Sequence, residues 1–273
     1  MKSLFVPIDY QRHTDSVVQC AGSLANQFGA EIILFHCFQL PLVSAETSYT
    51  QYPIEQLYED NLIALDNIKH KLLDTEENKI EVRSLVKPGF PGASILEEAK
   101  QNNCDLILMT SSQKSKLGEI FIGSTSVYVA RHSKIPVLSI PENFSYKFIK
   151  RILISISPQT IFHEHYLYAI KQFRESYKAQ TELMSIFSKE EENKKNNLDE
   201  WRKALNISTE CVHYFKREKG HVSDSIKNTA TFGDADLLIT FPQKHSLLEK
   251  VFQENITKEL VLHSSRPLLT INE

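Results

Sequence analysis

The feature that most constrains this chain is an internal repeat. Several short motifs recur 131 residues apart: Gly89 and Gly220, Asp105-Leu-Ile-Leu and Asp236-Leu-Leu-Ile, and RHSKIP from Arg131 and LHSSRP from Leu262. The apolar motif that begins at Leu4 recurs at Ile152, 148 residues later. A fixed spacing indicates two copies of one structural unit, and 273 residues suffice for two domains. We therefore predict one domain over 1–145 and a second over 146–273.

Each copy alternates short apolar runs with longer stretches of helical spacing. In the first copy we predict strands over 3–9, 30–38, 79–86, 104–110 and 136–141, and helices over 14–28, 52–74, 90–102 and 123–132. Motifs such as DLILM and PVLSI are apolar on successive residues, which is typical of strands buried on both faces of a parallel sheet. The pattern predicts an α/β fold: a doubly wound parallel five-stranded sheet sandwich of Rossmann-like type, duplicated in tandem.

The last strand of each copy would leave an apolar edge that invites pairing. We predict that these strands, near 136–141 and 267–272, lie adjacent and antiparallel about a pseudo-twofold axis. The two copies would then form an intramolecular pseudo-dimer. Further dimerisation through other faces, and an unknown protein partner, stay open.

Composition and charge limit the partner classes and the cellular location expected for this chain. A net charge of -3 and a pI near 6.4 give no electrostatic reason to expect nucleic acid or an anionic membrane as partner. The first residues are too short an apolar run for a signal peptide, and no other run has the length of a membrane span. The four cysteines form no CxxC pair, which suits reduced thiols. We expect a cytoplasmic protein.

Ligands in doubly wound sheets bind beyond the carboxyl ends of the strands. In the first copy Asp9 ends the first strand, Cys37 the second and Thr110 the fourth, and Gly-Ser-Thr-Ser over 123–126 opens a helix. Glycine and hydroxyl residues at a helix N-terminus suit a phosphate, because free N–H groups and the helix dipole face it. The alternative is that Ser124 only caps the helix.

These motifs together, namely VPIDY, the strand ending FHC, Gly89, DLILMTSS, LGEIFIGSTS and RHSKIPVLSI, resemble the universal stress protein family over the whole first copy. The nucleotide-binding form of that family carries a Gly, a second Gly three residues on, and a Gly-Ser or Gly-Thr pair after nine more residues. Here those places hold Thr110, Gln113 and Gly123-Ser124.

The resemblance implies a site for ATP or another adenine nucleotide, with Mg²⁺. Asp9 would meet the adenine or ribose, the backbone of Cys37 would contact the base, and Pro7 and Met109 would line the cleft. The phosphates would lie against Gly123, Ser124, Thr125 and Ser126. Side chains at Thr110 and Gln113, where the family has glycine, hinder close backbone approach.

The second copy departs further from the family. Ser157 stands where the first copy has Asp9, Phe241 and Lys244 stand at the two glycine places, and Glu254-Asn255 replaces Gly123-Ser124. A carboxylate at that helix start would satisfy the free N–H groups itself and repel phosphate. We predict that only the first copy binds nucleotide.

The two repeat spacings differ because the first copy carries an insertion of about 17 residues between its second and third strands. We place it at Leu40 to Leu57. Since it leaves the end of the second strand, we expect it beside the mouth of the first cleft, where Tyr49, Tyr52 and Tyr58 could cover a base or fill the cleft.

Metal binding and classical catalysis are not favoured. His163 and His165 fall at the start of a predicted helix and should point apart, whereas Cys211 and His213 would share a face only on a strand. The signatures GxSxG, Walker A and GxGxxG are missing, and Ser111-Ser112 has no recognisable partner base. We predict no metal site and no catalytic residue.

We therefore interpret the chain as a tandem, non-catalytic stress-response or signalling protein whose first copy binds adenine nucleotide weakly. One alternative is a ligand-free interaction module with both clefts filled by side chains, and another is a slow ATPase or nucleotidyl transferase. Asp9 separates the first two: a carboxylate free in an open cleft favours a ligand, and one buried in a hydrogen-bonded pair does not.

Overall fold

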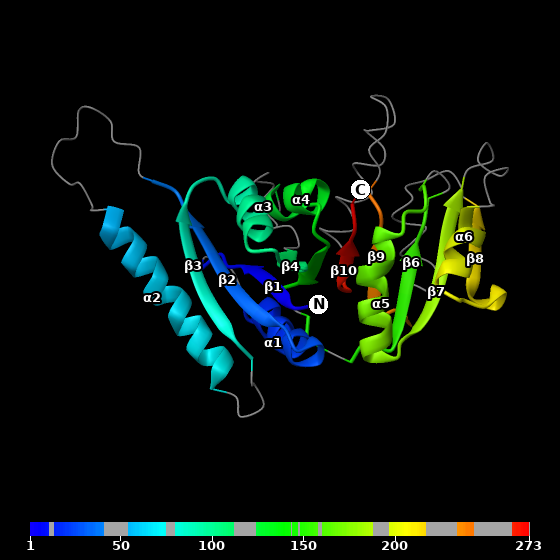
Figure 1. The fold of residues 1–273 in the computed structure, drawn as a ribbon, viewed down its shortest axis with the longest axis horizontal. Helices are drawn as coiled ribbons and strands as arrows, with labels where there is room; N and C mark the ends of the chain where they lie inside the picture. Colours follow the sequence, from blue (N-terminus) through cyan, green and yellow to red (C-terminus); the bar gives the residue numbers. More distant parts are fainter. Residues whose placement is uncertain are drawn as a thin grey trace, which may run out of the picture.

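The computed structural model places every described strand in one sheet (Figure 1). It describes residues 1–10, 14–40, 54–74, 80–111, 124–142, 144–146, 148–157, 160–187, 197–216, 234–242 and 264–272. The strand order is β3-β2-β1-β4-β5-β10-β9-β6-β7-β8. Among these strands only β5 and β10 pair antiparallel, and all other neighbours are parallel.

The first half of the sheet follows the predicted alternation. Its elements are β1 (Ser3–Pro7), α1 (Asp15–Phe28), β2 (Glu31–Phe38), α2 (Ile54–Leu73), β3 (Val82–Pro88), α3 (Pro91–Gln101), β4 (Leu106–Ser111), α4 (Ser124–His132) and β5 (Val137–Pro141). Each lies within a few residues of its predicted range. The predicted strands and helices are therefore confirmed.

The second half repeats the strand order in reverse across the sheet. Its elements are β6 (Arg151–Ser155), α5 (His165–Tyr177), β7 (Gln180–Phe187), α6 (Asn197–Ala204), the 3₁₀ turn η2 (Thr209–Cys211), β8 (Val212–Lys216), β9 (Leu237–Thr240) and β10 (Leu268–Thr270). Most residues between β8 and β9, and between β9 and β10, lie outside the described part. The α/β fold class, duplicated in tandem, is confirmed.

Both faces of the sheet are buried because its strands alternate between two apolar layers. Leu4 of β1 packs in the layer that contains α1, α2, α5 and α6. The next residue, Phe5, packs in the other layer, together with Ile95 of α3 and Val129 of α4. A strand buried on both faces reads as a continuous apolar run, as the sequence of β1 does.

The repeat extends to individual hydrogen bonds. Asp105 lies just before β4, and its Oδ2 accepts the backbone N–H groups of Lys2 and Ser3 at the start of β1. Asp236, 131 residues later, accepts the N–H groups of Lys150 and Arg151 at 2.8 and 2.9 Å. In each half an equivalent aspartate therefore links the start of the fourth strand to the start of the first strand by hydrogen bonds.

The two halves meet where β5 and β10 pair. Leu138 lies opposite Leu269, and these two residues are equivalents under the 131-residue repeat, so a pseudo-twofold axis passes between them. The helices α1 and α5 also meet, with the ring of Phe28 edge-on to that of Phe173 at 5.3 Å between centroids. The predicted antiparallel pairing of the last strands is confirmed.

The predicted insertion runs into helix α2 of the first half. Helix α2 has 20 residues and lies along β3, whereas α6, its counterpart, has 8 (Figure 1). The last residues of the predicted insertion, from Ile54 to Leu57, form the first turn of α2, and Tyr58 is exposed on it. Tyr49 and Tyr52 lie outside the described residues, so the position of this segment beside the cleft stays a prediction.

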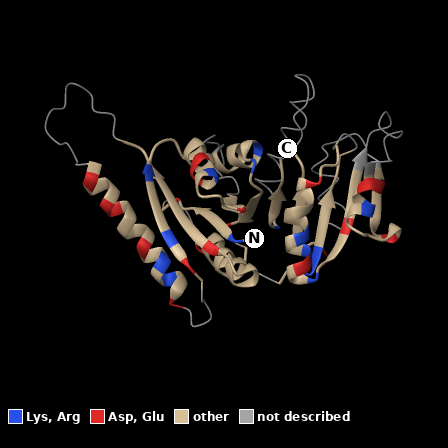
Figure 2. Cartoon of the chain, in the orientation of Figure 1, with Lys and Arg blue, Asp and Glu red and all other residues tan. Residues whose placement is uncertain are grey.

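Figure 2 shows charges of both signs along α2, with acidic residues over most of the helix and lysines near its carboxyl end. No helix within the described ranges is long and apolar enough to cross a membrane.

We predict that Leu269→Ala lowers the free energy of unfolding by about 2 to 5 kcal/mol, because it empties space at the fully buried junction. Urea denaturation followed by circular dichroism measures this loss. The matched control is Ile161→Ala, which removes a similar side chain that is 63% exposed and should change stability by less than about 0.5 kcal/mol. Equal losses for the two variants would contradict a shared core at this junction.

Candidate functional site

The carboxyl ends of β1, β2 and β4 lie side by side in the first half. The pairing registers of β1 with β2 and of β1 with β4 bring the three ends to one edge. Pro7 ends β1 and is half-buried, and Asp9 follows it on the surface. Cys37 is the second-last residue of β2, and Thr110 is the second-last residue of β4. The structure thus brings together the predicted residues at these strand ends.

Asp9 is exposed and is therefore not the buried carboxylate that would argue against a ligand at this edge. The backbone on either side of it is fixed. The N–H of Ile8 donates to the carbonyl of Phe35 at 2.7 Å, which extends the β1–β2 ladder by one step. Asp9 therefore lies at the point at which β1 leaves the sheet.

Tyr10 and His36 fix the backbone where β1 ends. The sequence analysis did not identify either residue as part of the site. The Tyr10 ring lies against the His36 ring at 4.1 Å between centroids, and its hydroxyl donates to the carbonyl of Asn61 on α2 at 2.7 Å. His36 Nδ1 donates to the carbonyl of Ile8 at 2.8 Å. Burial, and secondarily the charge of Asp66, raise the pKa of Tyr10, so the phenol remains a donor. Their only signal in the sequence is adjacency to Asp9 and Cys37.

Cys37 can offer its backbone to a ligand. In a parallel ladder, alternate residues direct both N–H and C=O to the same neighbouring strand. Phe35 bonds toward β1 and Phe38 toward β3, where its carbonyl accepts the N–H of Gly89 at 2.9 Å. The backbone of Cys37 therefore faces the β1 side, beyond the end of β1. Burial raises the pKa of its thiol despite the opposing hydrogen bond with Ser94, so the side chain is neutral.

Gly89 allows α3 to approach this edge closely. Its φ is +154°, and a Cβ there would lie 2.6 Å from Ser94 Oγ on α3. Any other residue would be strained at this φ and would force the Ser94 hydroxyl to move. Below it, Lys87 of β3 pairs with the buried carboxylate of Glu98 on α3, and this hydrogen bond raises the pKa of Lys87.

The phosphate side of the predicted site is described only in part. Thr125 is half-buried in the first turn of α4, and Ser126 is buried beside it. Met109 is 7% exposed and packs in the apolar layer rather than offering an open wall. Ser124 begins α4. Gln113 and Gly123 lie outside the described residues, as does Ser112, whereas Ser111 is buried.

The equivalent edge of the second half, as far as the structure describes it, has the same backbone hydrogen bond but an aromatic side chain in place of Thr110. The N–H of Ile156 donates to the carbonyl of Met184 at 2.8 Å, as Ile8 does to Phe35. Phe241, in the place of Thr110, is buried with its ring 4.6 Å from that of Trp201 and 4.9 Å from that of Tyr166. Lys244 and Glu254-Asn255 lie outside the described residues. Aromatic side chains occupy this position where the first half has Thr110.

The four residues considered for a metal are placed differently from one another. The rings of His163 and His165 stack at 5.5 Å between centroids, so the expectation that they point apart was wrong: His163 precedes α5, outside helical geometry. Cys211 ends the turn η2 and does not share the strand of His213. Within the described ranges, no three His, Cys, Asp or Glu side chains are grouped closely enough to hold a metal ion.

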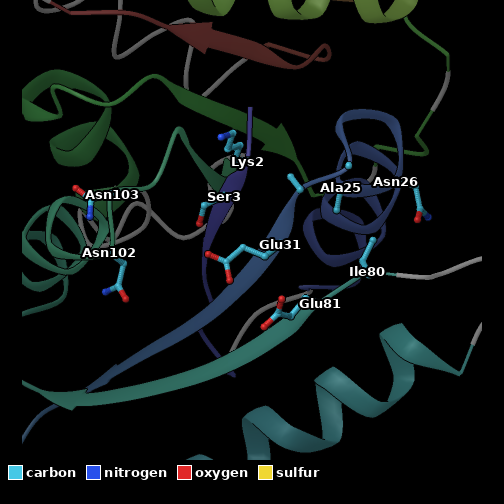
Figure 3. A pocket seen from close by; sticks show the side chains of 11 residues that line it. Lys2, Ser3, Ala25, Asn26, Glu31, Ile80, Glu81, Asn102 and Asn103 are labelled. Atoms are coloured by element: carbon cyan, nitrogen blue, oxygen red, sulfur yellow. The ribbon is translucent and has the colours of Figure 1, made fainter.

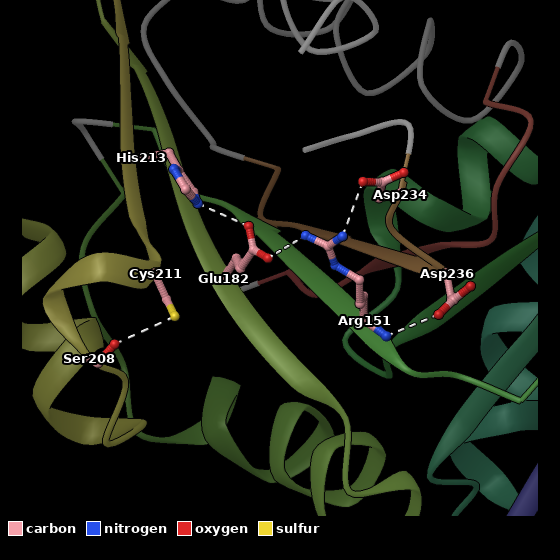
Figure 4. Close-up of polar contacts among 7 residues, drawn as sticks. All are labelled: Arg151, Glu182, Ser208, Cys211, His213, Asp234 and Asp236. Atoms are coloured by element: carbon pink, nitrogen blue, oxygen red, sulfur yellow. Dashed lines mark hydrogen bonds and ion pairs between the residues drawn. The ribbon is translucent and has the colours of Figure 1, made fainter. Parts of the chain in front are cut away.

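His213 instead belongs to a charged row across β6, β7 and β8 (Figure 4). Glu182 accepts from Arg151 at 2.6 Å and from His213 at 2.9 Å, and Arg151 also contacts Asp234 at 3.1 Å. Burial would raise the pKa of Glu182, but the hydrogen bonds from Arg151 and His213 outweigh it and lower that pKa. This row stabilises the sheet by charge complementarity and holds Glu182 ionised.

A depression of about 720 Å³ lies at the opposite, amino edge of the first half (Figure 3). It lies between the ends of α1 and α3 and the starts of β1, β2 and β3, and Lys2, Glu31 and Glu81 contribute its charges. Glu31 is already paired with Arg83 at 3.1 Å. The depression is far from the strand ends that carry the predicted nucleotide residues, and it shares none of them.

Comparison with known proteins identifies relatives for half of the chain. The model of the universal stress protein family matches residues 1–141. A universal stress protein of Synechocystis is 26% identical over 147 residues, covering 50% of this chain and 94% of that protein. One of Methanocaldococcus jannaschii is 28% identical over 140 residues, covering 50% of this chain and 80% of the relative.

Solved structures match the whole chain. A universal stress protein from Archaeoglobus fulgidus has a TM-score of 0.71 at 19% identity, covering 99% of this chain and 98% of that one. A functionally unknown protein from Pseudomonas aeruginosa PAO1 has a TM-score of 0.69 at 14% identity, covering 100% and 92% of the two chains. At these identities the likeness shows a common fold that spans both halves.

We predict that Glu182→Gln lowers the free energy of unfolding at about pH 7 by about 1 kcal/mol, a value discounted for partial exposure of the row. The folded-state pKa of Glu182 lies below its ordinary value of 4.5, so its stabilising effect is present above about pH 4.5 and is lost as the pH falls through the folded-state pKa. Urea titrations at several pH values should therefore converge for variant and parent in acid. The exposed Glu175→Gln serves as control, and a difference that persists unchanged in acid would refute the assignment.

Proposed function

The chain belongs to the universal stress protein family, and from this we propose that its first half binds one adenine nucleotide weakly, as a non-catalytic stress-response or signalling protein. The observation that carries the proposal is the arrangement at the carboxyl edge of the first half. There an exposed carboxylate, Asp9, adjoins a strand end, Cys37, whose backbone faces the space beyond β1.

The base end of the nucleotide suits these two residues. An adenine presents a donor and an acceptor on one edge, which match the C=O and N–H of a single strand residue such as Cys37. Asp9 accepts hydrogen bonds from ribose hydroxyls or from the base. Tyr10 and His36 support the proposal because they fix the backbone that carries Asp9. Pro7 adds an apolar side to the same edge.

The phosphate end suits the start of α4. Backbone N–H groups at a helix N-terminus and the helix dipole both favour an anion, and Thr125 adds a half-buried hydroxyl there. A nucleoside triphosphate would bind as its complex with Mg²⁺. Weak binding follows from the side chains at Thr110 and Gln113, where nucleotide-binding relatives have glycine.

One site per chain follows from the contrast between the halves. The ring of Phe241 packs against Trp201 and Tyr166 at the place of Thr110, and Ser157 lacks the carboxylate of Asp9. The second half therefore offers packing where the first offers polar groups. A cytoplasmic location and a protein partner remain predictions.

We predict that calorimetric titration with ATP and Mg²⁺ gives one site per chain and that Asp9→Ala abolishes the heat of binding, because it removes the carboxylate that faces the ligand. Ser157→Ala at the equivalent position is the matched control and should bind like the parent. Two sites per chain, or unchanged affinity in Asp9→Ala, would show that the site lies elsewhere. No binding by the parent to ATP, ADP or AMP would end the proposal.

We also predict that Thr110→Gly combined with Gln113→Gly tightens ATP binding by about 1 kcal/mol or more, as expected for one recovered backbone hydrogen bond to a charged phosphate. Phe241→Gly in the second half is the control, since it removes a side chain from the corresponding place. It should lower the melting temperature without adding a second site. Tighter binding in the control, or none in the double variant, would contradict the role given to the missing glycines.

A further inference from the structure

Helix α4 contacts a residue of the second half at its carboxyl end. Asn272 follows β10 and is 6% exposed. Its side-chain amide donates to the backbone carbonyl of Ala130 at 2.9 Å and to that of Ser133 at 2.8 Å. Both hydrogens of one amide are therefore used on the end of a helix that belongs to the other half of the sheet.

These bonds complete a helix end that would otherwise be incomplete. The last carbonyls of an α-helix have no partner within the helix. Here His132 Nδ1 donates to the carbonyl of Tyr128 at 2.8 Å, and the N–H of Ser133 donates to that of Val129 at 2.9 Å. Asn272 supplies the donor for Ala130, the next carbonyl along the chain. A side chain from across the junction thus supplies a donor to one of the last carbonyls of α4.

The residue equivalent to Asn272 in the first half cannot make the corresponding contact. Under the repeat that makes Leu138 and Leu269 equivalent, the counterpart of Asn272 is Pro141, which has no side-chain donor. Asn272 is itself connected to the second half, because His165 at the start of α5 lies with its Nε2 3.4 Å from the Asn272 carbonyl oxygen. A chain of contacts therefore leads from α5 through Asn272 to α4.

We infer that the second half is a built-in positioning element for the nucleotide site of the first half, acting through Asn272. The inference rests on the proposed function, since the amino end of α4 is the proposed phosphate site. A helix of nine residues is rigid along its axis, so fixing its carboxyl end also fixes the N–H groups at Thr125 and Ser126. Asn272 is a positioning residue and does not touch the ligand.

The test compares two buried hydrogen bonds that cross the same junction. Asn272→Ala and Asn272→Asp remove the donors to α4, and the aspartate also sets a carboxylate against two carbonyl oxygens. The matched control is Thr270→Val, which removes the bond from Thr270 Oγ1 to the carbonyl of Val137 at 3.1 Å on β5 and leaves α4 untouched. Each full-length variant is measured for ATP affinity by calorimetry, for melting temperature, and for amide hydrogen exchange along α4.

A positioning role predicts that both Asn272 variants weaken ATP binding about fivefold to tenfold, as expected for the loss of one or two hydrogen bonds. Exchange in α4 should accelerate by a similar factor, while Thr270→Val lowers only the melting temperature. Equal effects of the Asn272 and Thr270 variants on affinity and exchange would overturn the inference, as would Asn272 variants that match the parent in both.

Hydrogen exchange separates this inference from the proposed function. If the parent binds no nucleotide, the proposed function fails, and the exchange of α4 still decides whether Asn272 holds the helix. If the parent binds ATP and the Asn272 variants bind it equally well with unchanged exchange, the proposed function stands and the positioning role fails.

Discussion

The antiparallel pairing of β5 with β10 is the contact on which the rest of the structure depends. Each of these strands would otherwise be an apolar edge, with a row of unpaired backbone groups. Their pairing at Leu138 and Leu269 turns two five-stranded halves into one sheet. It also sets α1 against α5 on one face and brings Asn272 to α4. The core, the relation of the halves and the end of the proposed phosphate helix all follow from this one register.

The same backbone frame carries different side chains at the two carboxyl edges. Ile8 and Ile156 make equivalent bonds, yet the next residue is the exposed Asp9 in one half and Ser157 in the other. At the fourth strand, the half-buried Thr110 corresponds to Phe241, which packs among aromatic rings. The contrast lies in a few side chains at strand ends, which is where ligand binding can be lost without cost to the sheet.

The fold could be predicted from the sequence because its signals are local or repeated. Buried parallel strands are continuous apolar runs, and the repeat predicted that the last strands of the two copies pair, as Leu138 and Leu269 do. The candidate site was harder to predict from the sequence than the fold. Asp9 and Cys37 follow from the rule for strand ends, but Tyr10 and His36 act through contacts between segments far apart in the chain, which no local pattern encodes. The stacking of His163 on His165 was missed because the helix was assumed to begin two residues too early.

Joining the two halves in one polypeptide changes what substitutions can do. In a symmetric pair of identical chains, any substitution appears on both sides of the axis. One half could then not have asparagine where the other half has proline at the equivalent position. In this chain the residues between β5 and β6 make the pairing intramolecular, and it does not weaken on dilution. Asn272 and Pro141 could therefore diverge independently, one half becoming the support and the other keeping the polar edge. Covalent linkage is what permits this division of labour within a single sheet.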